Sequence, residues 1–473
     1  EMYNAFYYLS NMFYISRTAF DTPSSPLVYL PRAPASSRSR PTGESMKAYR
    51  IADSVYALHA DIDSHDLFEG IWPIPHGVSL NSYIVKGEKT ALIDLVRDWC
   101  EAPKVLAAEL AELGIDLAKV DYLILNHMEP DHTGWLGPLK QVTRGFELVA
   151  TPKALRLAKS FFGLDESFCT LHPVKSGDRI DLGKGKVLRF EEIPHVHWPE
   201  TMATYEESSR TLFPCDAFGS FGAIREEAPF DDQLSESELA FFEEEAVRYF
   251  ANIVVAFSGP VKKALEKIDT LDIRILAPGH GIVWRKNPGR IVELYRRLAA
   301  WSSAPTEPEI TLLWSGTEPS MGPLVKAAID GARAEGVQIH VHKVPETHIS
   351  YILSSVLRSS GVILGVPYAR DPLPSPLAHA LDDLGRKRIT GRKFFWFLQG
   401  KGLEPEGERL SEALEAEIDR ILEKYQMRWE ALESAHIPRH TEEFVYQQTR
   451  ALVMELLAGG AIKGHVQELV GAP

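Results

Sequence analysis

Four metal-binding side chains lie close together in the stretch LILNHMEPDHTGWLGPL, residues 123–139. They are His127, Glu129, Asp131 and His132. The apolar residues of DYLILNH predict a buried strand, and we expect a loop after it to carry the four side chains. Imidazole and carboxylate groups are metal ligands, so this stretch predicts part of a metal centre.

Three later segments place a histidine or aspartate directly after an apolar stretch, as at the mouth of a strand. In IPHVHWPETMATY, LFPCDAFGSFG and LAPGHGIVWR the candidate ligands are His197, Asp216 and His280. Together the candidates exceed the ligand set of one tetrahedral zinc ion. Their carboxylates offset much of the charge of two divalent ions, and a carboxylate can bridge two metals. The sequence therefore predicts a metal pair, and mixed imidazole and carboxylate ligands suit iron at least as well as zinc.

The composition limits the partners and the kind of metal site. The chain has 473 residues, too many for one core, and its 45% apolar and 25% charged residues are typical of a globular protein. The net charge of −14 disfavours nucleic acid and anionic membranes as partners, and no run approaches the roughly 18 apolar residues of a membrane helix. Cys100, Cys169 and Cys215 form no CxxC pair, which excludes a four-cysteine zinc site or a disulfide framework. We therefore expect a cytoplasmic protein.

The sequence divides into an extension and two domains. Residues 1–45 begin with an aromatic, apolar segment and continue as a Pro-, Ser- and Arg-rich linker, so we expect a poorly ordered extension. Residues 46–302 alternate β-rich and helical runs, with candidate ligands at strand ends, which suits a layered α/β sandwich. After the polar segment WSSAPTEPE, residues 309–473 alternate strands such as ITLLW and GVILGVPY with helices such as PLVKAAIDGARAEG. That order predicts a parallel, doubly wound sheet.

The motifs HMEPDH, HWPETM, DAFG and PGHG, in this order, resemble those of the flavodiiron proteins, also called A-type flavoproteins. The resemblance extends from Met46 to the last helical segment. It implies a metallo-β-lactamase-like αββα sandwich that holds two iron ions, followed by a flavodoxin-like domain that holds FMN. Hydrolases of the same superfamily carry His-x-His-x-Asp-His and usually bind zinc. Flavodiiron proteins carry glutamate at the second position, as Glu129 does here.

Carried over residue by residue, the resemblance implies a ligand set for each iron. His127, Glu129 and His197 would bind one iron, Asp131, His132 and His280 would bind the other, and Asp216 would bridge them. The resemblance favours His197 over His195, which we expect to be structural or to support a ligand. If the segment around Asp216 is extended, Cys215 faces away from the metal and packs in the core.

The flavin site would lie at the carboxyl ends of the strands of the second domain. The resemblance implies contacts from three loops, which carry Ser315, Thr317 and Ser320, then Pro367 and Tyr368, then Gly400 and Gly402. The first loop, SGTEPSMGP, departs from the family pattern, because Pro319 replaces a glycine and Met321 replaces a threonine. Proline lacks an N–H, so we expect an altered phosphate site.

The resemblance implies an oxidoreductase that reduces dioxygen to water, nitric oxide to nitrous oxide, or both, with electrons delivered through FMN. It also implies a separate rubredoxin or flavin reductase as electron donor, and a head-to-tail homodimer or homotetramer. Tyr205 and Tyr249 are candidates to line the substrate pocket. Two alternatives stay open. The altered flavin loops motivate a flavin-free diiron sensor of dioxygen, and the third reading is a zinc hydrolase, against which Glu129 argues.

Overall fold

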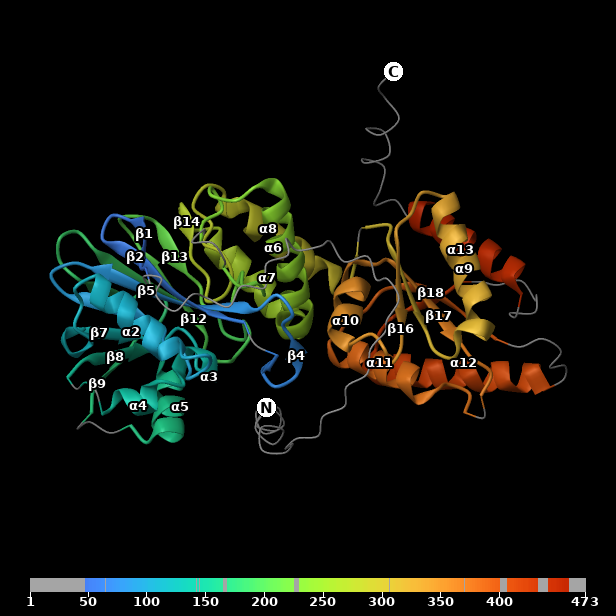
Figure 1. Cartoon of the computed structure of the whole chain (residues 1–473), viewed down its shortest axis with the longest axis horizontal. Helices are drawn as coiled ribbons and strands as arrows, with labels where there is room; N and C mark the ends of the chain where they lie inside the picture. Colours follow the sequence, from blue (N-terminus) through green and yellow to red (C-terminus); the bar gives the residue numbers. More distant parts are fainter. Residues whose placement is uncertain are drawn as a thin grey trace, which may run out of the picture.

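The structure, a computed structural model, has two lobes that lie side by side (Figure 1). It describes residues 47–458 apart from residues 64, 142, 144, 165–167, 225–228, 306, 370, 400–405 and 433–440. The expected extension over residues 1–45 lies outside the described residues. Among the helices that are described, none combines the length and the apolar character needed to cross a lipid bilayer.

The first lobe is a sandwich of two β-sheets, with strand orders β1-β2-β5-β6-β7-β8-β9 and β10-β11-β12-β13-β14. The first sheet contains β1 Tyr49–Ala52, β2 Val55–Ile62, β5 Val78–Lys86, β6 Thr90–Ile93, β7 Tyr122–Ile124, β8 Glu147–Ala150 and β9 Thr170–Pro173. The second contains β10 Arg179–Asp181, β11 Val187–Glu192, β12 Met202–Glu206, β13 Thr211–Phe213 and β14 Ile275–Leu276. A separate hairpin consists of β3 Leu67–Phe68 and β4 Trp72–Pro73.

Both faces of the first sheet are buried. Successive residues of a strand point to opposite faces, so Val55 of β2 joins a core between the two sheets, together with Phe190 and Phe213 of the second sheet. Leu58 of the same strand faces the outer helices. The helices of this lobe are α2 Ala102–Glu112, α3 Pro130–Thr133, α4 Leu136–Leu139, α5 Pro152–Phe162, α6 Glu236–Tyr249, α7 Ser258–Ile268 and α8 Pro288–Trp301. This arrangement confirms the predicted αββα fold class.

Helix α6 begins at a capping box, in which the Ser235 side chain accepts from the backbone N–H of Glu238 and the Glu238 side chain accepts from that of Ser235. The helix continues into a π-helical turn, Phe250–Val254, and a 3-10 turn, Val255–Phe257, before α7 begins. Figure 1 shows α6, α7 and α8 gathered on the side of the first lobe that faces the second lobe.

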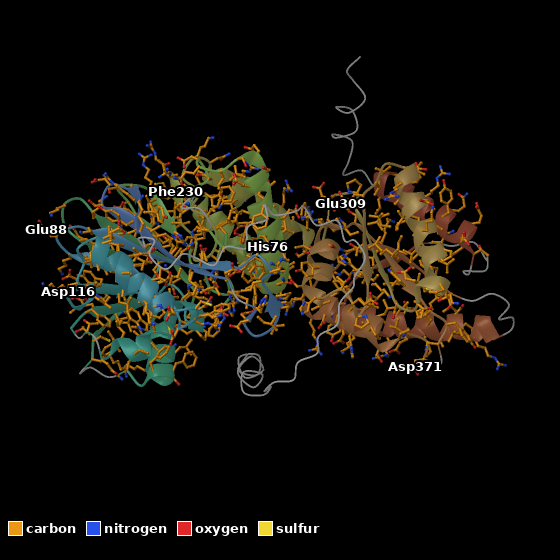
Figure 2. All side chains as sticks on the ribbon, in the orientation of Figure 1. His76, Glu88, Asp116, Phe230, Glu309 and Asp371 are labelled. Atoms are coloured by element: carbon orange, nitrogen blue, oxygen red, sulfur yellow. The ribbon has the colours of Figure 1, made fainter. Side chains whose placement is uncertain are left out.

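The second lobe has a five-stranded parallel sheet of order β16-β15-β17-β18-β19. Its strands are β15 Ile310–Trp314, β16 Ile339–Lys343, β17 Gly361–Val366, β18 Lys393–Leu398 and β19 Glu430–Ala431. Its helices are α9 Glu318–Ala334, α10 Ile349–Arg358, α11 Ser375–Arg386, α12 Glu406–Tyr425 and α13 Glu442–Ala458. Helices α9 and α13 pack together, and α11 packs on α12, so the predicted doubly wound sheet is confirmed. Figure 2 shows Glu309, before β15, and Asp371, after β17, at opposite edges of this lobe.

The lobes meet where α6 and its π-helical turn contact α10. The buried Arg248 guanidinium donates to the carbonyl oxygen of Pro73 at 2.7 Å and to Ser350 Oγ of the second lobe at 3.2 Å. Arg358 of α10 pairs with Glu244 of α6 at 2.8 Å. The buried Arg248 guanidinium thus links the hairpin and α6 of the first lobe to α10 of the second lobe.

Candidate metal centre

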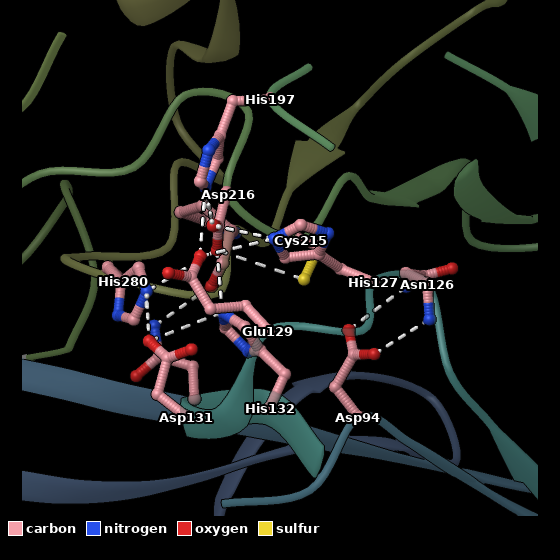
Figure 3. A network of polar contacts seen from close by, with 12 residues as sticks. Asp94, Asn126, His127, Glu129, Asp131, His132, His197, Cys215, Asp216 and His280 are labelled. Carbon is pink, nitrogen blue, oxygen red and sulfur yellow. Dashed lines mark hydrogen bonds and ion pairs between the residues drawn. The ribbon is translucent and has the colours of Figure 1, made fainter. Parts of the chain in front are cut away.

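The first motif follows the buried strand β7. His127 is fully buried, and Glu129, Asp131 and His132 are each at most 5% exposed. The loop predicted for all four is wrong for two of them, because Asp131 and His132 lie in the one-turn helix α3. Proline at the first position of a helix costs no hydrogen bond, so Pro130 favours this turn. The turn brings the last two side chains beside the first two (Figure 3).

The other three candidate ligands come from separate loops. His197 follows β11, Asp216 follows β13 and His280 follows β14. All three side chains are buried, and Figure 3 shows them converging with those of the first motif. The expectation that strand ends would deliver these residues is confirmed. His195, in contrast, is exposed and stacks on Phe257.

The seven side chains form two groups. Within each group, all ligand atoms lie within 4.8 Å of one another; the groups are His127, Glu129, His197 and Asp216, and Asp131, His132 and His280. Asp216 faces both. Its Oδ2 lies 3.1 Å from His197 Nε2, and its Oδ1 lies 2.6 Å from His132 Nε2 and 3.3 Å from His280 Nε2. A carboxylate with one oxygen toward each group has the geometry of a bridging ligand.

Hydrogen bonding supports a cation in the second group. Both Asp131 carboxylate oxygens, His132 Nε2 and His280 Nε2 are buried, and their short contacts with one another and with Asp216 lack the geometry of hydrogen bonds. His280 Nδ1 lies 2.8 Å from the carbonyl oxygen of Ser79, and because a carbonyl only accepts, Nδ1 carries the proton. In the neutral ring, Nε2 then presents its lone pair to the centre, as a metal ligand does. These residues therefore fit a metal ion.

Charge inside the pair of groups is balanced between imidazoles and carboxylates. Burial by itself lowers the pKa of His197, but Glu129 and Asp216 outweigh burial and raise that pKa to about 10. Burial by itself raises the pKa of the Asp216 carboxyl, but His132 and His127 outweigh it and hold that pKa well below its ordinary value. The Asp216 carboxylate thus stays ionised, and this buried negative charge requires a positive charge beside it. A bound metal supplies that charge and takes the place of the imidazole protons.

Several supporting residues escaped the sequence analysis. Buried Glu200, which belongs to the quoted HWPETM motif, accepts from the backbone N–H of Met128 at 3.1 Å, and its Oε1 lies 3.5 Å from His127 Nδ1. Asp94 accepts from the backbone and the side chain of Asn126, at 2.8 and 3.1 Å. These contacts fix the backbone on both sides of His127. Glu200 could have been found from the sequence because it lies inside the HWPETM motif. Asp94 lies in none of the quoted motifs, so no such signal existed for it.

Cys215 and Tyr205 correct the sequence analysis, whereas Tyr249 lies beside the centre. Cys215 has φ of 51°, so its segment is not extended, and its sulfur lies within 4.8 Å of ligand atoms of His132 and Asp216. The expectation that it faces away from the centre is wrong. Tyr205 donates to the carbonyl oxygen of Asp272 at 2.8 Å instead of lining the site. The fully buried ring of Tyr249 packs against that of His280, with 5.6 Å between centroids.

The candidate flavin residues gather at the carboxyl ends of β15 and β17. Ser315 is buried, Thr317 Oγ1 lies 2.9 Å from Ser320 Oγ, and the Tyr368 ring is 47% exposed. A Cβ on Gly316, which has φ of 105°, would lie 2.9 Å from Pro367 Cβ, so the two loops are closely packed. Gly400 and Gly402 lie outside the described residues.

Only part of this edge fits the flavin. The exposed ring of Tyr368 and the nearby hydroxyls suit an aromatic, phosphorylated cofactor. At the start of α9, however, Glu318 adds a negative charge and Pro319 removes an N–H from the helix end that would face the phosphate.

Comparison with known proteins finds one matching family model and several relatives of this chain. A family model described as ODP family beta lactamase matches residues 78–281. The nitric oxide reductase of Moorella thermoacetica is 31% identical over 360 residues, covering 75% of this chain and 87% of that protein. The anaerobic nitric oxide reductase flavorubredoxin of Aliivibrio fischeri is 31% identical over 67% of this chain, which spans 62% of that protein's length.

Solved structures of other proteins resemble this chain over most of its length. A variant of the flavo di-iron protein from Thermotoga maritima is 26% identical, with a TM-score of 0.71 over 86% of this chain and 98% of that one. The rubredoxin oxygen:oxidoreductase of Desulfovibrio gigas shares the fold, at 23% identity and a TM-score of 0.73 over 87% and 99% of the two chains. With a relative matched at this identity over most of its length and the same two-lobed fold, this chain belongs to the flavodiiron protein family.

Proposed function

We propose that this protein is an oxidoreductase that reduces nitric oxide to nitrous oxide, dioxygen to water, or both, at a pair of iron ions. The observation that carries the proposal is the pair of buried ligand groups that share Asp216, one of which contains Glu129. Similarity to proteins named as nitric oxide reductases supports the same reaction class. Zinc hydrolysis is disfavoured because glutamate stands where that class of enzyme carries histidine.

When bound, two ferrous ions supply binding positions and electrons for a diatomic molecule, and FMN passes electrons from an external donor. Each ion would be held by one ligand group. Asp216 would fix their spacing, because its two oxygens face different groups. Glu200 and Thr201 approach His127 Nδ1, at 3.5 and 3.2 Å, and orient its other nitrogen toward the centre.

Aromatic side chains form a dry wall beside the second group. The rings of Phe68 and Tyr249 lie 5.4 and 5.6 Å from that of His280, and Phe221 packs against both. The Tyr249 hydroxyl is buried without a hydrogen-bond partner among the described residues, and burial raises its pKa well above the ordinary value. It therefore stays protonated and can donate a hydrogen bond to a diatomic molecule bound beside His280.

FMN would be held by the hydroxyls of Ser315, Thr317 and Ser320 on its phosphate side and by Pro367 and Tyr368 on its ring side, together with Gly400 and Gly402. Glu318 and Pro319 at the start of α9 support weaker binding of the phosphate than a helix start without these two residues would provide.

The partners follow from the same proposal. A rubredoxin or a flavin reductase would donate electrons, and a head-to-tail homodimer or homotetramer would bring the flavin of one chain to the irons of another. The three cysteines, none of which forms a disulfide, support a reducing compartment such as the cytoplasm. Nucleic acid and membranes are not among the proposed partners.

The first test is metal and flavin content after anaerobic purification, by elemental analysis and visible absorbance, followed by consumption of nitric oxide and of dioxygen. We expect two irons per chain and reductase activity with at least one of the two gases. Zinc in place of iron, or iron without reductase activity, would overturn the proposal.

The ligand assignment has its own test. Glu129→Ala should remove most of the iron, because it deletes a ligand and leaves Asp216 as the one remaining carboxylate of this ligand group. His195→Ala is the matched control: it removes a histidine two positions from His197 that is exposed, and it should leave iron content unchanged. Full iron occupancy and activity in the Glu129 variant would contradict the assignment.

A further inference from the structure

A second glutamate touches the metal centre from outside the four motifs. Glu69 lies in the turn of the β3–β4 hairpin, and its carboxyl group lies within hydrogen-bonding reach of that of Glu129. The Glu129 carboxylate also faces His127 and His197, at 3.2 and 2.9 Å, so Glu69 contacts a candidate metal ligand directly.

The backbone at Glu69 is held in an unfavourable conformation. Its φ of 51° is left-handed, a region that non-glycine residues rarely adopt, and Gly70 beside it has φ of 73°. A turn of this shape is more stable with glycine or asparagine at both positions. The strain is compatible with a side chain that is retained for what it contacts.

Behind Glu69, two further residues lead out of the centre into the other lobe. Trp72 Nε1 donates to Glu69 Oε2 at 3.0 Å, and the Trp72 ring is 6% exposed. The Lys387 ammonium, which follows α11 of the second lobe, lies 4.9 Å from the centroid of that ring and donates to the carbonyl oxygen of Asn252. Figure 1 shows β4 next to α10 and α11, where the two lobes meet.

The charge of Lys387 suits its place at the outer end of these contacts. Burial lowers the pKa of Lys387 to about 8, while Glu69 and Asp383 act in the opposite direction. A cation over the face of a tryptophan is stabilised by the ring and polarises its N–H, which strengthens the bond that Trp72 donates. The path therefore runs from a lysine of the second lobe, through one indole, to a carboxyl group that touches a candidate metal ligand.

We propose that Glu69 is a positioning residue for Glu129, and that Lys387 and Trp72 hold Glu69 in place. The position of the second lobe then determines the geometry of the metal-binding group formed by His127, Glu129 and His197. The inference rests on the proposed metal centre. Contacts that orient a ligand typically change metal affinity by about 10- to 100-fold. Lys387 acts at a distance and should fall at the lower end of that range.

The test compares Lys387→Met with Arg358→Met. Both substitutions remove a cation that crosses the junction between the lobes, but Arg358 pairs with the half-exposed Glu244 and contacts no residue of the metal centre. In the iron-loaded protein, Lys387→Met should speed the loss of one iron to a chelator by roughly tenfold. In the apoprotein titrated with Co²⁺, it should change the visible absorption of one bound ion. Arg358→Met should change neither.

Substitutions of Glu69 separate positioning from simple packing. Glu69→Gln keeps the length of the side chain and its amide N–H can donate to Glu129, so it should retain the Co²⁺ spectrum, whereas Glu69→Ala should alter it at least as much as Lys387→Met does. The melting temperature of each apoprotein is measured in parallel, and equal values for Lys387→Met and Arg358→Met show that folding is not the cause.

Two failures can be told apart. If the wild-type chain binds neither two irons nor two Co²⁺ ions, the proposed metal centre itself is wrong. If the wild type binds both ions while Lys387→Met and Glu69→Ala keep its spectrum and its rate of iron loss, the link from the second lobe is wrong and the metal centre stands.

Discussion

Individual side chains of this protein are set by opposed electrostatic demands. Asp216 stays ionised in a fully buried position because four imidazoles surround its two oxygens. His342 of β16 shows the reverse case. Burial, and then the charge of His340, lower the pKa of His342 to about 4, and its Nε2 lies 2.9 Å from Ser355 Oγ. The surroundings of Asp216 therefore favour a bound cation, whereas the surroundings of His342 disfavour its protonation.

The pKa of His342 predicts a pH dependence of stability. Its folded-state pKa, about 4, is lower than the ordinary value of 6.5, so the unfolded chain binds more protons between these pH values. The contribution of His342 to stability is therefore complete above pH 6.5 and is lost as the pH falls toward 4, by at most about 3 kcal/mol. His342→Gln should flatten this part of the profile. Urea unfolding at intervals from pH 7 to 4 measures it, and parallel profiles for both proteins would refute the prediction.

At the scale of elements, the start of α9 decides how well the second lobe can hold a phosphate. A helix start attracts anions because its first N–H groups are unpaired and its dipole is positive there. Here Glu318 occupies the first helical position and Pro319 the second. Both reduce the positive potential at the end of β15, which is where a flavodoxin-like sheet binds its cofactor.

Restoring this helix start should strengthen flavin binding. The double variant Glu318→Gln with Pro319→Gly removes the charge and returns an N–H, so we expect the Kd for FMN to fall by about tenfold, which corresponds to about 1.4 kcal/mol. Quenching of flavin fluorescence on titration of flavin-depleted protein measures the Kd. Asp330→Asn, which removes a charge farther along the same helix, should have no effect. An unchanged Kd in the double variant would place the phosphate elsewhere.

The whole molecule depends on the junction between its lobes. Arg392 is 1% exposed and donates only to carbonyl oxygens, among them those of Trp301 at the end of α8 and Leu357 near the end of α10, at 2.8 and 2.7 Å. The C-terminal ends of helices carry partial negative charge, which offsets the cost of burying this cation. Burial nevertheless lowers the pKa of Arg392 to about 9. One side chain thus joins the last helix of the first lobe to the second lobe.

Removing this cation should destabilise the protein strongly. Arg392→Met leaves several buried carbonyl groups without a donor, so we expect a loss of about 3–5 kcal/mol. Lys393→Met is the control, because Lys393 forms partly exposed pairs with Glu430 and Glu455 that contribute about 1 kcal/mol or less. Equilibrium unfolding in urea compares the two. Equal losses would show that Arg392 does not join the lobes.

Local sequence patterns were sufficient to assign the fold class and to name the candidate ligands. Periodicity is local, so strands such as β15 and β17 could be recognised from a few consecutive residues. The four short motifs named every side chain of the two metal-binding groups, because each motif is contiguous. The helix predicted to begin at Pro323 starts earlier, at Glu318, since one proline removes only one hydrogen bond from the first turns.

Only the tertiary structure decided what surrounds those ligands. Glu69 and Glu129 are far apart in the sequence and unrelated by any motif, and their contact exists because the β3–β4 hairpin folds over the centre. The same holds for Asp94 beside Asn126 and for Tyr249 beside His280. The orientation of Cys215 depended on one left-handed φ, which no residue type announced. Sequence patterns report local conformation and burial, whereas long-range contacts depend on how sheets, helices and lobes pack.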